Sequence, residues 1–159
     1  MSLLPRHRRR GMIQIRACTP EDATAVSALL DELGYRVSAS QAAEHIRELG
    51  NTGSDPAFLA IEDGQVLGLV ALHICRMLQY AAPVMRVTAL VVSKRARRRG
   101  VGELLMEHAE HLAAMAGCEA IELTSAVGRA EAHAFYRSIG YEANSLRFRK
   151  ALTSPGHRR

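Results

Sequence analysis

The sequence of 159 residues is poor in aromatic residues and in cysteine. It has no tryptophan, four tyrosines and three phenylalanines, so it lacks the interleaved aromatic rings on which single-stranded nucleic acids stack. Its three cysteines, Cys18, Cys75 and Cys118, are widely separated and form no C-x-x-C pair. We therefore predict no disulfide framework and no metal site, and we expect three reduced thiols that pack as small apolar side chains.

Long apolar runs are also absent. No stretch approaches the ~18 consecutive apolar residues that a membrane-spanning helix requires, and the basic segment 1–11 has no apolar run of the kind found in secretion signals. We expect a cytoplasmic protein without a membrane partner. The length and the ordinary balance of 48% hydrophobic and 23% charged residues predict one globular domain.

The positive charge is concentrated at the two ends of the chain. The formal net charge is +5, four arginines lie in residues 1–11, and Arg158 and Arg159 close the chain. Removing these six positive charges from +5 leaves −1 for the rest. We expect two basic tails, residues 1–11 and 153–159, with the first disordered. This distribution argues against a basic nucleic-acid-binding fold, although the tails and the cluster from Lys94 to Arg99 keep that function as a rival hypothesis.

The periodicity of apolar residues predicts an alternating order of strands and helices. Local signals mark the element boundaries: a helix start at Thr19-Pro20, a helix end at Gly34 and a hairpin turn at Asp63-Gly64. Three consecutive strands predict an antiparallel meander, and the strand–helix–strand unit 84–123 predicts a parallel crossover. The fold class is thus α/β, a single domain with a mixed, mostly antiparallel sheet and helices on both faces. Predicted strands cover 12–17, 57–62, 65–76, 84–92, 120–123 and 146–152; predicted helices cover 20–33, 40–49, 100–116 and 131–139.

One turn has the composition of an anion site. The apolar strand 89–92 leads to Arg97-Arg98-Arg99-Gly100-Val101-Gly102, where a helix begins. A helix start presents unpaired N–H groups and a positive dipole end, and glycine lets a phosphate approach the backbone. A dinucleotide fingerprint would need a glycine at Leu105, and the Gly-Lys-Ser/Thr of a P-loop is absent. On its own, the turn is either a phosphate cradle or an ordinary helix start with two glycines.

Two segments together resemble a known family. Leu90-Val91-Val92 followed by Arg97-x-x-Gly100-x-Gly102 is similar to the acetyl-CoA motif of the GNAT superfamily of N-acetyltransferases. The segment from Ala132 through Phe135-Tyr136 to Gly140-Tyr141 resembles that family's A-x-x-F-Y-x-x-x-G-F/Y segment. The order of elements also matches, so residues 12–152 are identified as an N-acetyltransferase domain.

The resemblance implies a site for acetyl-CoA. A splayed pair of strands would hold it, with the backbone of Leu90, Val91 and Val92 pairing with the pantetheine arm. The pyrophosphate would lie on the turn, and the arginines beside it would lie near the adenosine phosphate or in solvent. Homodimers are common in the family, and one is expected here. The turn residues assigned to the donor are Arg97, Arg98, Arg99, Gly100, Val101, Gly102 and Glu103.

The resemblance also implies the catalytic acid. The tyrosine of the F-Y pair lies beside the sulfur in the family, and a phenol is protonated at neutral pH, so Tyr136 is the expected general acid. The base is open, because Thr88 stands where many relatives have glutamate. Glu122, His73 and His133 are candidates, and a chain of water molecules is the conservative alternative.

The acceptor is expected to be the primary amine of a small molecule or peptide, acetylated by direct attack. The residues that would border its cleft are Gly34-Tyr35-Arg36, His73, Arg76 and Tyr80. Arg36, Arg76 and Arg86 would suit an acceptor that carries a carboxylate or phosphate. The rival hypothesis from another class is a non-catalytic acyl-CoA-binding or sensing module, which the threonine at position 88 favours.

Overall fold

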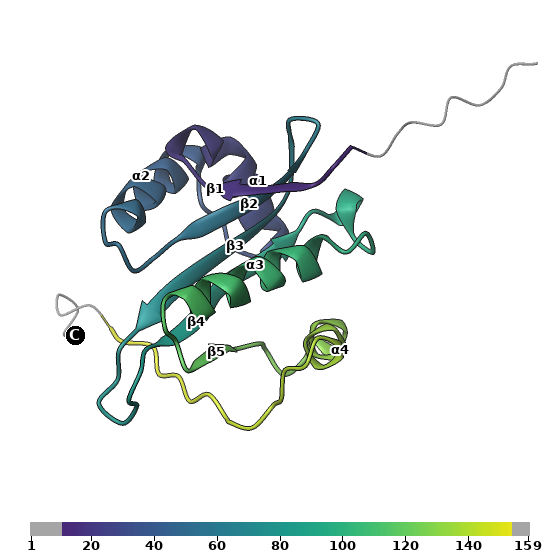
Figure 1. Cartoon of the computed structure of the whole chain (residues 1–159). Helices are drawn as coiled ribbons and strands as arrows, with labels where there is room; N and C mark the ends of the chain where they lie inside the picture. The colour runs from purple at the N-terminus through teal and green to yellow at the C-terminus, as the bar shows by residue number, and fades with distance from the viewer. Residues whose placement is uncertain (1–10, 154–159) are drawn as a thin grey trace, which may run out of the picture. The chain divides into compact units, whose positions relative to one another are not determined.

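The computed structural model describes residues 11–153, in two compact units that meet in the sequence between Leu123 and Thr124 (Figure 1). The first unit contains one sheet of five strands in the order β1-β2-β3-β4-β5. β1 to β4 pair with one another in antiparallel fashion, and β5 is parallel to β4. The mixed, mostly antiparallel sheet is therefore confirmed. Its strands are β1 (Gln14–Ala17), β2 (Ala57–Glu62), β3 (Gln65–Cys75), β4 (Val84–Val92) and β5 (Ala120–Leu123).

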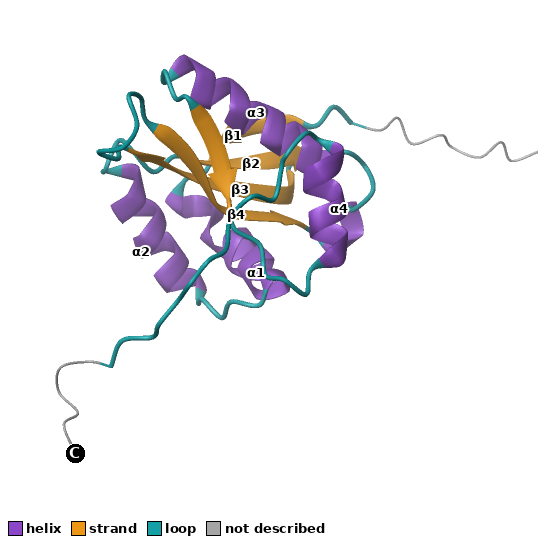
Figure 2. Cartoon of the chain, turned by 90° about the horizontal axis from the view of Figure 1, so that it is seen from below, coloured by secondary structure: helices purple, strands orange, loops and turns teal. Residues whose placement is uncertain are grey.

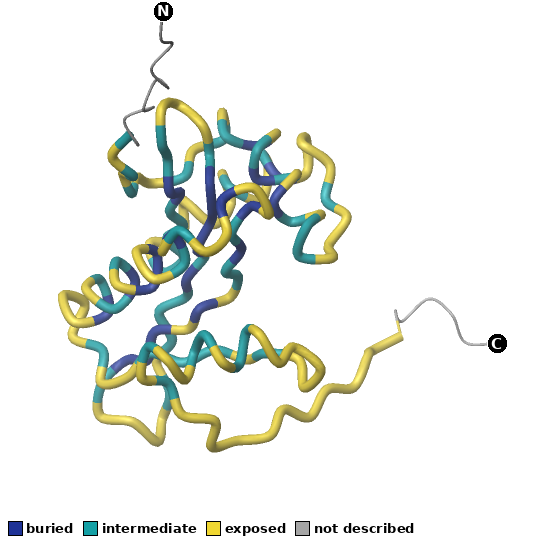
Figure 3. The backbone as a smooth tube through the Cα atoms, turned by 90° about the vertical axis from the view of Figure 1, so that its right-hand side faces the viewer, coloured by how far each residue is buried: buried dark blue, intermediate teal, exposed yellow. Residues whose placement is uncertain are grey.

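Helices cover both faces of this sheet, as the views in Figures 1 and 2 show. α1 (Ala23–Leu33) and α2 (Ala39–Gly50) pack on one face, where Val26 and Leu29 join Leu59, Leu69 and Val91 in one buried cluster. α3 (Val101–Met115) packs on the other face: a Cβ at Gly68 of β3 would lie 3.0 Å from Leu105. Buried residues follow the central strands, dark blue in Figure 3.

Local sequence accounts for the element boundaries. A short 3-10 turn (Pro20–Asp22) precedes α1, and Thr19 and Asp22 form a capping box there. Gly34 ends α1 in the left-handed conformation, with φ of 102°. Asp63 and Gly64 both have positive φ, 50° and 76°, which is the geometry of a two-residue type I′ hairpin. The hairpin prediction is therefore confirmed.

Pairing in the middle of β4 is irregular. Leu72 lies opposite Val87 and Ala71 lies opposite Ala89, so Thr88 is an extra residue, a β-bulge, between them. A bulge bends and twists its strand locally, and such bends often occur beside active sites.

The second unit contains α4 (Ala130–Ser138), close to the predicted 131–139. The predicted strand 146–152 is wrong: these residues belong to no strand of the structure, and Leu146, Phe148 and Leu152 are exposed. Alternation favours an extended chain but does not supply a neighbouring strand. The predicted tails 1–11 and 153–159 lie outside the described residues, apart from Gly11 and Thr153. Within residues 11–153, no helix is both long and apolar enough to cross a bilayer.

Candidate active site

Strands β4 and β5 separate halfway along β4. The parallel pairing runs only from Val84 opposite Ala120 to Val87 opposite Leu123, whereas β4 continues to Val92. Within the described residues no strand pairs with that side of β4 beyond Val87. An extended ligand can therefore use the free backbone groups of residues 88–92 as a strand would. This fork contains the predicted donor residues Leu90, Val91 and Val92.

The fork leads directly into the predicted phosphate turn. After β4, Ser93 is buried and its N–H donates to the carbonyl of Leu67 at 2.8 Å; Ala96 is also buried. Gly100 is the N-cap of α3, with φ of 78°, and no side chain of the described residues caps this helix start. The first-turn N–H groups of α3 therefore lack a side-chain acceptor, which fits a site for the oxygens of a phosphate.

The arginines of the turn differ in what they contact. Arg99 donates from one terminal nitrogen to both carboxylate oxygens of Glu62 at 2.7 Å, and both side chains are largely buried. This ion pair fastens the turn to the β2–β3 hairpin. Arg97 and Arg98 are exposed, and neither forms an ion pair within residues 11–153. Arg98 has φ of 60°, a left-handed conformation that glycine adopts at lower cost.

A row of charged side chains crosses the sheet one residue before the fork. His73, Arg86 and Glu122 lie directly opposite one another on β3, β4 and β5, so their side chains share one face of the sheet. Arg86 Nε donates to Glu122 Oε1 at 2.6 Å, and His73 Nδ1 lies 2.7 Å from Asp55 Oδ1. The row thus brings together two of the three candidate bases and one of the three candidate anion-binding arginines. It also adds Asp55, which sequence reasoning missed.

The sheet face that carries this row belongs to the side of α1 and α2. On β3, His73 follows Leu69 and Ala71 at every second position, and Leu69 packs in the cluster beneath those helices. At the row itself the side chains of His73, Arg86 and Glu122 are 39%, 51% and 41% exposed. The helices therefore leave the row open to an incoming molecule.

Tyr136 lies on α4 in the second unit. Its ring contacts the rings of Phe135 and Tyr141, at centroid distances of 5.3 and 6.0 Å. Burial raises the pKa of Tyr136 above its ordinary value, and the nearby Arg129 opposes this shift only in part. A phenol of ordinary pKa is already protonated at neutral pH, and the shift acts in the same direction, so Tyr136 holds the proton that a donor needs. In the same unit, His133 Nε2 bonds the carbonyl of Ala126 at 2.9 Å.

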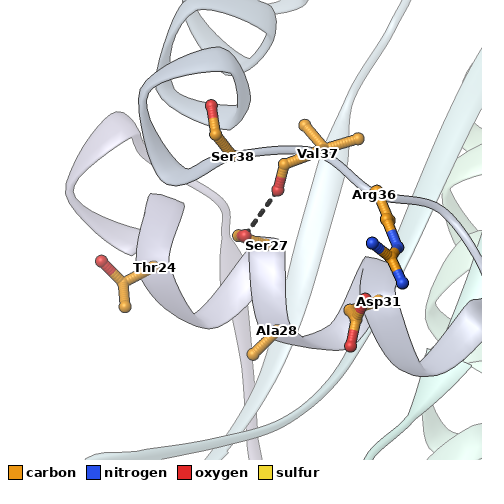
Figure 4. A pocket seen from close by; sticks show the side chains of 7 residues that line it. All are labelled: Thr24, Ser27, Ala28, Asp31, Arg36, Val37 and Ser38. Carbon is orange, nitrogen blue, oxygen red and sulfur yellow. Dashed lines mark hydrogen bonds between the residues drawn. The ribbon is translucent and has the colours of Figure 1, made fainter.

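A hollow of about 460 Å³ lies between α1 and the loop that follows it (Figure 4). It is lined by the side of α1 opposite the sheet, including Ser27 and Asp31, and by Arg36 from the loop. Ser27 Oγ donates to the carbonyl of Val37 at 2.6 Å, which fixes the loop against α1. Arg36, predicted to border the acceptor cleft, lines this hollow. Tyr35 and Tyr80, predicted to border the same cleft, are both exposed.

In the part of the chain that the structure describes, the cysteines and the residue types that bind metals form no further reactive or metal-binding site. Cys18, Cys75 and Cys118 are all free and partly buried, and burial raises the pKa of Cys18 to about 11. A thiol with so high a pKa is a poor nucleophile at neutral pH. Among residues 11–153, no group of three histidine, cysteine or acidic side chains is arranged to hold a metal ion.

Comparison with known proteins shows which family has this sequence and fold. The model of the acetyltransferase (GNAT) family matches residues 23–141. The chain is 33% identical over 147 residues to the aminoalkylphosphonate N-acetyltransferase of Salmonella typhimurium, covering 87% of this chain and 91% of that protein. The chain therefore belongs to the GNAT family of acetyltransferases and is an acyltransferase.

Solved structures support the same fold. A GNAT family acetyltransferase of Staphylococcus aureus superposes with a TM-score of 0.76 at 24% identity, covering 88% of this chain and 98% of that one. A transcriptional regulator from Bacillus halodurans superposes with a TM-score of 0.81 at 19% identity, covering 89% and 100%. At such identities the likeness concerns the fold alone. The family implies acetyl-CoA as the acyl donor.

Proposed function

We propose that this protein transfers the acetyl group of acetyl-CoA to the primary amine of a small molecule that also carries an acidic group, such as an aminoalkylphosphonate. Transfer occurs by direct attack of the amine on the thioester. The observation that carries the proposal is the fork between β4 and β5, which ends in the uncapped start of α3. The family and the enzyme relative favour this function over a non-catalytic acyl-CoA-binding module.

The donor side of the site rests on backbone rather than on side chains. The free edge of β4 from Thr88 to Val92 can pair with an extended arm that carries amides of its own. The N–H groups at the start of α3 and the positive end of its dipole suit a pyrophosphate, and Arg97 and Arg98 add positive charge beside it. We assign Arg99 chiefly to holding the turn in place, since Glu62 occupies its guanidinium.

On the acceptor side of the site, positively and negatively charged side chains lie next to one another. Arg86 uses Nε for Glu122, which leaves its two terminal nitrogens as donors for a phosphonate or carboxylate. His73 lies on the adjacent strand, about 4.8 Å away, which is comparable to the separation of the amino and acidic groups on a short alkyl chain. The relative in Salmonella, whose name states an aminoalkylphosphonate acceptor, supports the same class of substrate.

We assign the final proton donation to Tyr136, whose raised pKa keeps its phenol protonated. The departing CoA thiolate gains this proton when the carbon–sulfur bond breaks. General acid catalysis of this kind contributes roughly 10²- to 10⁴-fold to a rate. Tyr136→Phe keeps the ring and removes the proton, so we expect kcat to fall by roughly 100-fold or more while the Kd for acetyl-CoA stays unchanged.

The experiment is a comparison of matched acceptors. We expect kcat/KM for aminoethylphosphonate to exceed that for ethanolamine, which lacks the acidic group, and that for ethylenediamine, which replaces it with a second cation. Arg86→Met should remove most of the preference and leave activity toward ethanolamine nearly unchanged. Equal activity with all three acceptors would refute the acidic-group assignment, and acetyl-CoA binding without turnover of any amine would favour the non-catalytic module.

A further inference from the structure

We propose that His73, oriented by Asp55, is the base that removes the proton from the acceptor's ammonium group. The inference rests on the proposed function, because it names a group for a step of that reaction. It does not follow from the family resemblance, because this chain has Thr88 where many relatives are expected to have the glutamate. It follows from the hydrogen bonds and the position of one pair of side chains, His73 and Asp55.

The hydrogen bonds of Asp55 fix the tautomer of the neutral His73 ring. Thr52 Oγ1 and Ser54 Oγ donate to Asp55 Oδ2 at 2.5 and 3.0 Å, and His73 Nδ1 lies 2.7 Å from Oδ1. The bond from Thr52, followed by those from Ser54 and His73, holds the pKa of Asp55 below its ordinary value despite an opposing effect of burial. An ionised carboxylate only accepts hydrogen bonds, so Nδ1 of His73 carries the proton. The Nε2 atom of the neutral ring then has a free lone pair, as a base requires.

Backbone hydrogen bonds hold the loop that carries Asp55 on both sides of His73. The N–H of Leu72 donates to the carbonyl of Pro56 at 2.9 Å, and the N–H of Ile74 donates to the carbonyl of Ser54 at 2.8 Å. The two residues that flank His73 are therefore tied to the two residues that flank Asp55. The geometry of the pair is built into the backbone and does not depend on two freely rotating side chains.

The position of His73 suits an amine that approaches the fork. His73 lies opposite Arg86, and the next residue of β4, Val87, is the last to pair with β5. Neighbouring strands are about 4.8 Å apart. An amine that lies over β4 is therefore one strand spacing from His73 on β3, and one strand spacing from the open side of the fork on the opposite side. The His73 side chain is 39% exposed, and Arg86 is the charged group that faces it from the neighbouring strand.

The other candidate bases are less suitable in the structure. Arg86 Nε donates a hydrogen bond of 2.6 Å to Glu122 Oε1, so this carboxylate oxygen is already occupied by a partner on the neighbouring strand. His133 Nε2 is bonded to a carbonyl and must therefore donate. His108 packs edge-on against Phe58, with centroids 4.4 Å apart, and its Nε2 is buried without a partner among the described residues. His73 alone among them combines an oriented Nδ1 with an accessible ring.

The proton balance closes with these groups. His73 Nε2 takes one proton from the ammonium, the neutral amine attacks the thioester carbonyl, a carbon–nitrogen bond forms and the carbon–sulfur bond breaks. Tyr136 gives its proton to the thiolate. The nitrogen loses a second proton as the amide forms, and this proton restores the phenol of Tyr136. The net reaction releases one proton, which passes from His73 to solvent.

The test is the pH dependence of kcat/KM for aminoethylphosphonate in the wild type and in the variants His73→Gln and Asp55→Asn. The control variant is His45→Gln, which alters an exposed histidine of α2. We expect His73→Gln to lose roughly 100-fold or more at neutral pH, with the deficit shrinking as the pH approaches ~10, near the pKa of an alkylamine. Asp55→Asn should lower kcat with little change in KM, because the amide no longer enforces the tautomer. His45→Gln should match the wild type.

The outcomes separate the two proposals. A wild type that acetylates no amine overturns the proposed function and the assignment of His73 with it. An active wild type together with a His73→Gln variant of equal activity at every pH overturns the assignment of His73 alone. A second measurement uses the wild type and an alkoxyamine that carries the same phosphonate group but a nitrogen that is already neutral: the fall in rate at acid pH should disappear, and a retained fall would contradict the inference.

Discussion

Gly100→Ala separates the backbone geometry of the donor turn from its side-chain chemistry. Gly100 has φ of 78° and ψ of 9°, and a Cβ built there meets no atom within 4 Å. The substitution therefore causes no collision, and its cost is the left-handed conformation, roughly 1–2 kcal/mol for a residue other than glycine. The lower entropy of the unfolded chain offsets part of this cost, up to about 1 kcal/mol. We expect a net loss of about 1 kcal/mol, equivalent to a Tm lowered by roughly 2–4 °C.

The same strain should appear in ligand binding. If the alanine of the Gly100→Ala variant relaxes out of the left-handed region, the bound turn must restore that conformation, and about 1 kcal/mol corresponds to a roughly fivefold higher Kd for CoA. Thermal unfolding and titration calorimetry measure the two effects. Gly50→Ala is the matched control, because its Cβ also meets nothing within 4 Å and its φ is not positive. An unchanged Tm and Kd in Gly100→Ala, or an equal loss in Gly50→Ala, would refute the reasoning.

Three further substitutions test other features of the first unit. Arg98→Gly relieves a positive φ of 60° and should raise Tm by roughly 2–4 °C; a lower Tm would contradict this account. Glu62→Gln weakens the ion pair with Arg99 and should cost about 1–2 kcal/mol in chemical denaturation, with a double-mutant cycle showing coupling. Arg16 lowers the pKa of Asp22 from 3.8 to about 2, so this pair stabilises the fold above about pH 4 and loses that effect as the pH falls through about 2. The Tm deficit of Asp22→Asn should therefore vanish at low pH, and a constant deficit would argue against the pair.

Most of the fold was predictable because its boundaries are set by local chemistry. Asp63-Gly64 and Gly34 adopt positive φ, as the sequence predicts, and the strand from Val84 to Val92 has the predicted bounds. Which face of a helix is buried depends instead on packing. On α3, the large apolar side chains of Leu104 and Met115 are exposed, whereas Leu105, Met106, Ala109 and Ala113 are buried.

The donor turn could be predicted because it is contiguous in the sequence, from Arg97 to Gly102. The pair of Asp55 and His73 could not, because its members are 18 residues apart and meet only through the register of a loop against β3. Locally, the sequence around Asp55 predicts no more than a polar loop that ends in Asp55-Pro56 before a strand. The fork likewise requires the pairing of β4 and β5, and no single segment specifies where that pairing stops.

The activity proposed for this protein is the acetylation of an amine that also carries an acidic group. It is tested most directly by incubating the protein with acetyl-CoA labelled with carbon-13 in the acetyl group and with aminoethylphosphonate, and by following the labelled carbonyl by NMR. We expect an N-acetyl amide signal that grows with the release of CoA and is strongly reduced in Tyr136→Phe. Hydrolysis of the thioester to labelled acetate without any amide, at an acceptor concentration that saturates binding, would contradict it.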